Sequence, residues 1–74
     1  MLKIEIHLVN GGLLDLEESD SFWHRLVDLQ KCGFAGKELI HELISDDWGP
    51  PPRLVCIQGS LIDGTKIDVT LPYD

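Results

Sequence analysis

The alternation of apolar residues on both sides of Asp63-Gly64 constrains the fold of this chain more than any other sequence feature. Alternation with period two is typical of β-strands that bury one face. Six apolar residues of the two arms stand at odd positions, namely Val55, Ile57, Leu61, Ile67, Val69 and Leu71. The stretch from Arg53 to Leu71 therefore predicts a β-hairpin. Its polar face would carry Cys56, Gln58, Ser60, Lys66, Asp68 and Thr70.

The shared parity also predicts the loop of this hairpin. A two-residue turn at Asp63-Gly64 would pair odd positions with even ones, and it would send the apolar sets of the two arms to opposite faces of the sheet. A three-residue loop, Ile62-Asp63-Gly64, keeps both sets on one face when Gly64 adopts the left-handed conformation of a G1 bulge. We therefore expect Leu61 to lie opposite Thr65.

The N-terminal residues predict a further strand. Apolar residues at the even positions from Leu2 to Leu8 alternate with polar ones, as expected of a half-buried strand. Asn10-Gly11-Gly12 ends this strand, because these residues favour a turn. The next segment, 13–16, suits either a short returning strand or an apolar loop packed over the core, and both alternatives stay open at the level of sequence.

Two helices are expected in the middle of the chain. The first runs from N-cap candidates at 19–21 to about Cys32, since Gly33 is a natural stop. Its apolar stripe comprises Phe22, Trp23, Leu26, Val27 and Leu29. The second runs from about Gly36 to Asp46, with an apolar face of Leu39, Ile40, Leu43 and Ile44. The prolines at 50–52 exclude helix from that point, and Trp48 beside them is expected to anchor this connector in the core.

This order of elements predicts one α+β domain that spans residues 1–74. The expected architecture is a two-layer sandwich, in which a mainly antiparallel three-stranded sheet carries two helices on one face. Segment 13–16 adds a short fourth strand if it pairs. We expect the first strand to lie beside the last one, because every neighbouring pair is then antiparallel and the last strand is central.

Charge and hydropathy narrow the classes of function. Thirteen acidic residues against six basic ones give a net charge of −7, which opposes direct binding to nucleic acid. No stretch approaches the roughly 20 apolar residues of a membrane span, and the N-terminus does not resemble a signal peptide. The expected location is cytoplasmic. Cys32 and Cys56 lack a CxxC partner, so two reduced thiols are expected.

No motif predicts catalysis, a metal or a cofactor. His41-Glu42 begins like the helical zinc motif with two histidines four residues apart, but Ser45 stands where the second histidine is required. His7 and Cys56 are expected on the same polar sheet face, whereas Cys32 ends a helix that covers the other face. We therefore predict no enzyme and no metal site, and keep a small enzyme or metal-binding protein as a minor alternative.

Acidic residues near the first helix are the one feature that points to a partner. The partner-binding candidates are Asp15, Glu17, Glu18 and Asp20, with Asp46 and Asp47 at the end of the second helix. Such acids also suit the positive end of a helix dipole and a solvated surface. The functional hypothesis is a small acidic, non-enzymatic protein that binds and modulates or inhibits a larger, basic-surfaced protein. The alternative is a homodimer that buries Leu13, Leu14 and Leu16 together with the flank of the wide apolar stripe on the first helix.

Overall fold

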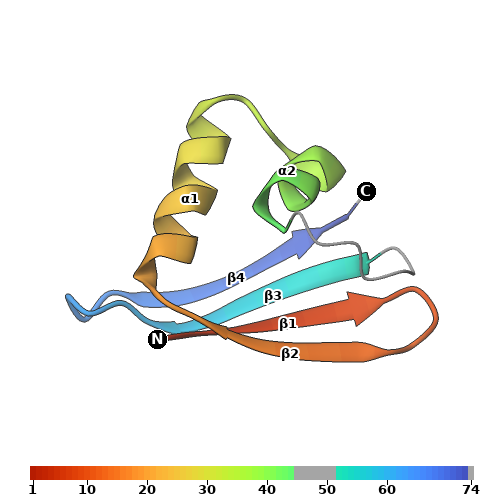
Figure 1. Ribbon diagram of the computed structural model, residues 1–74, viewed down its shortest axis with the longest axis horizontal. Helices are drawn as coiled ribbons and strands as arrows, with labels where there is room; N and C mark the ends of the chain where they lie inside the picture. Colours follow the sequence, from red (N-terminus) through yellow and green to blue (C-terminus); the bar gives the residue numbers. More distant parts are fainter. Residues whose placement is uncertain (45–51, 74) are drawn as a thin grey trace.

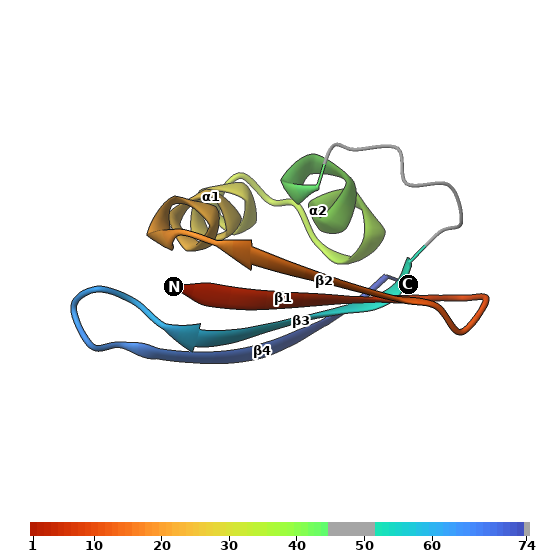
Figure 2. The same ribbon diagram turned by 60° about the horizontal axis from the view of Figure 1, so that its bottom comes forward.

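The computed structural model describes residues 1–44 and 52–73. Its elements, in chain order, are β1 (Leu2–Leu8), β2 (Leu13–Glu18), α1 (Asp20–Lys31), α2 (Gly36–Leu43), β3 (Pro52–Ser60) and β4 (Lys66–Pro72). The four strands form one antiparallel sheet in the order β2-β1-β3-β4. Both helices lie on one face of this sheet (Figure 1, Figure 2). The predicted two-layer α+β sandwich is confirmed, and its sheet contains a fourth strand.

The β3–β4 hairpin has the predicted register and loop. Ile57 pairs with Val69, and the ladder continues to Ser60 and Lys66. The Leu61 amide donates to the Thr65 carbonyl at 2.8 Å, and the Gly64 amide donates to the Leu61 carbonyl at 3.0 Å. Gly64 has a φ of +93°. These bonds close a three-residue loop with a left-handed glycine, which is the G1-bulge arrangement that the parity of the apolar residues requires.

The segment after Gly12 is a strand, not a loop, and it extends to Glu18. It is joined to β1 by a loop with the same geometry as the one between β3 and β4. The Leu8 amide donates to the Gly12 carbonyl at 2.9 Å, and the Gly11 amide donates to the Leu8 carbonyl at 3.1 Å. Gly11 has a φ of +89°. Val9-Asn10-Gly11 thus corresponds to Ile62-Asp63-Gly64, and each loop brings a returning strand into register.

The predicted position of the first strand was wrong, because β1 lies beside β3 and β4 is an edge strand. The returning strand β2 explains the difference. It carries the chain back to the end of the sheet where β1 begins, and the two helices then return it to the far end. Since β1 is antiparallel to both neighbours, β2 and β3 run in the same direction with β1 between them. Two parallel strands joined by a helical crossover suit this arrangement.

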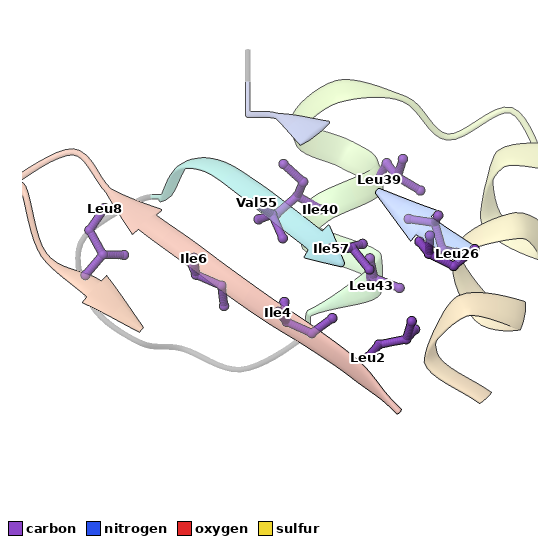
Figure 3. Packing of buried hydrophobic residues seen from close by; sticks show 11 residues of the cluster. Leu2, Ile4, Ile6, Leu8, Leu26, Leu39, Ile40, Leu43, Val55 and Ile57 are labelled. Carbon is purple, nitrogen blue, oxygen red and sulfur yellow. The ribbon is translucent and has the colours of Figure 1, made fainter. Parts of the chain in front are cut away.

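The core lies between the inner face of the sheet and the two helices. Its sheet side consists of β1 and β3 side chains together with Ile67 of β4, and its helix side consists mainly of α2 side chains (Figure 3). The fully or almost fully buried members are Leu2, Ile4, Ile6, Leu8, Leu26, Leu39, Ile40, Leu43, Val55, Ile57 and Ile67. Leu26 is the buried residue of α1, whereas Phe22, Trp23 and Leu29 of the same helix are half-buried against the core.

The helix boundaries agree with the sequence at the start and end of α1. Ser19 is its N-cap residue, although the Ser19 hydroxyl pairs with the Ser21 hydroxyl at 2.8 Å instead of capping an amide. Gly33 has a φ of +97° and follows the last turn, as expected of a helix stop. Helix α2 ends at Leu43, earlier than predicted. Asp46, Asp47 and Trp48 lie outside the described residues. Neither described helix is long and apolar enough to cross a membrane.

Candidate functional site

The acidic residues predicted to bind a partner do not gather on one face of the sheet. Residues that pair across two strands point to the same side. Asp15 pairs with Glu5, and Glu17 pairs with Lys3, so both acids lie on the outer face, away from the helices. Glu18 pairs with the core residue Leu2 and lies on the helix side. The alternation of β2 therefore divides the predicted cluster between the two faces.

Asp20 has a structural role. Its carboxylate Oδ2 accepts a hydrogen bond from the Ile62 amide at 2.9 Å, which ties the first turn of α1 to the β3–β4 loop. A carboxylate in the first turn also interacts favourably with the helix dipole. Next to this bond lies an open, largely apolar hollow lined by Met1, Ser19, Asp20, Ser21 and Ile62. Asp20 therefore stabilises the contact between α1 and the β3–β4 loop, and it also adds negative charge to the surface.

Strand β2 is an edge strand, because it pairs only with β1 in the part of the chain that the structure describes. Hydrogen-bonded and non-hydrogen-bonded pairs alternate along an antiparallel ladder. Since Leu8 and Gly12 form a hydrogen-bonded pair, the backbone groups of Leu13, Asp15 and Glu17 point away from β1. Leu13 and Leu16 are 49% and 41% exposed. An open edge of this kind offers backbone donors and acceptors to a further strand.

A second group of side chains meets on the outer face of the two central strands. Glu5 and His7 stand two residues apart on β1, and Cys56 of β3 lies directly opposite Glu5. One carboxylate oxygen, one imidazole nitrogen and the thiol sulfur all lie within 4.8 Å of one another. All three residues are half-buried. The Thr70 hydroxyl of β4 lies 3.8 Å from Cys56 Sγ. We call Glu5, His7 and Cys56 the outer-face cluster.

The sequence predicted the face on which His7 and Cys56 lie, although it predicted no metal site there. His7 and Cys56 lie on the polar face, as their parity requires, and Cys32 is exposed at the end of α1, apart from the cluster. Glu5 shares the parity and the face of His7, but it was not among the residues considered as ligands. The predicted strand order concealed the group, because a first strand beside β4 would place neither Glu5 nor His7 next to Cys56. The adjacency of β1 and β3 completes the group.

His41 and Glu42 do not form part of a site of this kind. His41 is exposed on α2, and its Nε2 lies 2.6 Å from the Tyr73 hydroxyl, with the two rings in an edge-to-face arrangement. The Glu42 carbonyl accepts a hydrogen bond from the Arg25 guanidinium of α1. These contacts join the C-terminal end of the chain and the first helix to α2. The presence of His41 and Glu42 is therefore accounted for by contacts that hold α2 against other elements of the fold.

Comparisons of this chain with protein-family models, with curated proteins and with solved structures give no match. Function is therefore inferred from two features of the molecule, the open acidic edge at β2 and the outer-face cluster. The first offers hydrogen-bonding groups and charge to a polypeptide. The second brings together three side chains whose atoms are common ligands of metal ions.

Proposed function

We propose that this protein is a non-enzymatic interaction module, whose β2 edge binds an extended basic segment of a larger protein and thereby modulates or inhibits that protein. The observation that supports the proposal is the open edge itself. Main-chain groups of Leu13, Asp15 and Glu17 point outward, and the strand carries carboxylates on both faces. Addition of a strand to a sheet edge is a common mode of peptide recognition.

The side chains of β2 define the segment that would fit. Asp15 and Glu17 stand two residues apart on the outer face, so lysine or arginine at every second position of an added strand lies opposite them. Each cross-strand pair of opposite charges contributes about 0.2–1 kcal/mol. Leu16 on the other face is 41% exposed and favours an apolar residue opposite it. The recognised pattern is therefore an alternation of basic and apolar residues.

Self-pairing through the same edge is less favourable. A dimer that pairs two β2 edges in one continuous sheet has its two-fold axis perpendicular to that sheet. This axis keeps each side chain on its own face, so odd-numbered residues pair with odd-numbered ones and even-numbered with even-numbered. The registers that cover most of β2 are centred on Asp15 or on Leu16. The first brings the two Asp15 carboxylates opposite each other, and the second brings Asp15 opposite Glu17. Like charges directly opposite are destabilising, so the edge favours a basic partner over a second copy.

The binding of a labelled peptide of alternating lysine and valine tests the proposal, with a glutamate–valine peptide as the control for charge. Two variants at one position separate the contributions of backbone and charge. Asp15→Pro removes an outward amide and leaves the β1–β2 hydrogen bonds intact, so it should abolish binding. Asp15→Asn keeps the amide and should weaken binding about 1.5- to 5-fold, which corresponds to one cross-strand charge pair. Fluorescence anisotropy measures both effects.

The control variant is Asp68→Asn, which removes an exposed acid from the outer face of the opposite edge strand, β4. It should leave the affinity unchanged. Equal loss of affinity in Asp15→Asn and Asp68→Asn would mean that net charge alone attracts the peptide, and unchanged binding by Asp15→Pro would exclude the edge. An affinity insensitive to salt would exclude the electrostatic contribution. Light scattering that shows a dimer at tens of micromolar would favour self-association instead.

A further inference from the structure

We propose that the outer-face cluster, Glu5, His7 and Cys56, binds a divalent transition-metal ion and that Zn²⁺ fits it best. The proposal is independent of the β2 edge, because the cluster lies on the two central strands. Its three ligand atoms are one oxygen, one nitrogen and one sulfur, and all lie within 4.8 Å of one another. Carboxylate, imidazole and thiolate are the side chains that coordinate zinc in proteins.

The geometry of the sheet arranges these side chains for coordination. Glu5 and His7 are two residues apart on β1, so both project from the same face, and Cys56 is the direct cross-strand partner of Glu5. Bond lengths of about 2.0–2.3 Å place neighbouring ligand atoms of a tetrahedral zinc about 3.3–3.8 Å apart. The ligand atoms lie within 4.8 Å of one another, so they must come somewhat closer to bind one ion. Small rotations about side-chain bonds can bring them together.

The ligand types distinguish the metal. Mg²⁺ and Ca²⁺ prefer sets made of oxygen atoms, whereas a thiolate selects softer ions and an imidazole suits zinc. Three protein ligands leave a fourth tetrahedral position for water or for a ligand from a partner. The thiolate and carboxylate together balance the two positive charges of the ion. The net charge of −7 further raises the local concentration of cations.

The neighbours of the cluster supply supporting groups. The Thr70 hydroxyl lies 3.8 Å from Cys56 Sγ and can donate a hydrogen bond to the sulfur once it is ionised. Asp15, which lies opposite Glu5 on the same face of the sheet, donates no hydrogen bond to that carboxylate but adds negative charge that attracts a cation. Hydrogen bonds to metal ligands from surrounding residues orient those ligands and tune the metal. The site therefore lies in a row of polar groups that crosses all four strands.

Titration of the metal-free protein with Co²⁺, followed by Zn²⁺ competition, tests the site. Co²⁺ bound to a thiolate produces a charge-transfer absorption band, which reports coordination by cysteine directly. We expect one equivalent of Co²⁺ to produce this band, Zn²⁺ to remove it, and Zn²⁺ to raise the thermal midpoint of the folded protein. The matched pair of variants is Cys56→Ser, which should abolish the band, and Cys32→Ser, which should retain it.

Two further variants test the other ligands without removing the thiol. His7→Gln and Glu5→Gln should each weaken Co²⁺ binding by at least about tenfold. Both substitutions lie on the polar face, and circular dichroism verifies that each variant is folded. Loss of the band in Cys32→Ser with retention in Cys56→Ser would overturn the proposal, as would wild-type protein that binds no Co²⁺ at tens of micromolar. A band unaffected by both His7→Gln and Glu5→Gln would likewise overturn it.

Discussion

Gly59→Ala should destabilise this protein much more than Gly64→Ala, because only the first substitution meets the backbone of another strand. Gly59 has a φ of +142°, and a Cβ atom there would lie 2.5 Å from the Met1 carbonyl oxygen and 3.1 Å from the Leu2 Cα. Gly64 has a φ of +93°, and a Cβ atom there has no neighbour within 4 Å. The two variants therefore share backbone strain, and they differ in the steric conflict between β1 and β3.

The expected losses of unfolding free energy follow from these two contributions. Backbone strain costs about 1–3 kcal/mol for a residue in a region that glycine normally occupies. Steric overlap in a packed site costs about 1–3 kcal/mol more, so Gly59→Ala should lose about 2–6 kcal/mol. Gly64→Ala should lose about 1–2 kcal/mol, from the left-handed conformation alone. A chain of this length has roughly 4–11 kcal/mol in total, so Gly59→Ala is expected to be close to the limit of folding.

Urea denaturation of the wild type and both variants measures these losses. Thermal unfolding gives a second estimate, since about 1 kcal/mol lowers the thermal midpoint of a domain of this size by about 4–8 °C. The Met1 ammonium donates to the Ser60 carbonyl at 3.0 Å, so the start of β1 lies against the end of β3. If Gly59→Ala costs no more than Gly64→Ala, this adjacency is wrong, and with it the strand order.

Three other perturbations have defined outcomes. Leu26→Ala removes the buried residue of α1 and should cost about 2–5 kcal/mol in urea denaturation, whereas the half-buried Leu29→Ala should cost less. Asp20→Ala should speed hydrogen exchange of the Ile62 amide, and Asp20→Asn, which keeps an acceptor, should not. The Thr65 hydroxyl and amide lower the pKa of Asp63, so the stability from this carboxylate is complete above its ordinary value of 3.8 and is lost as pH falls through the lower folded value. The acid-induced loss should therefore be smaller in Asp63→Asn, and equal pH profiles of the urea midpoint would contradict this.

The candidate sites show which features of a site a local sequence pattern can predict. Strand periodicity placed His7 and Cys56 on one polar face, because side chains alternate whatever the neighbours of a strand are. Periodicity did not predict the contact between Glu5 and Cys56, because that contact depends on which strand lies beside β1. The acidic residues illustrate the opposite case. Asp15 and Glu18 are close in sequence, yet the alternation of β2 places them on opposite faces.

The two hairpins share local sequence features, although the sequence predicted only the β3–β4 hairpin and left segment 13–16 open. In each, an apolar residue, Asn or Asp, and Gly form a three-residue loop, and the apolar sets on both sides share parity, odd around 62–64 and even around 9–11 apart from the exposed Leu13. The register follows from these local features because a shift by one residue would expose one apolar set. Val9-Asn10-Gly11 has the same kinds of residue as Ile62-Asp63-Gly64, and it likewise precedes a returning strand.

Only the tertiary structure decided the order of the strands. Periodicity specifies which face of each strand is buried, but a strand with one apolar face satisfies that condition beside either neighbour. The choice depends on the path of the chain through β2 and the two helices, which brings β3 alongside β1. That path is set by packing between residues far apart in sequence. The acidic edge at β2 and the cluster on β1 and β3 both result from it.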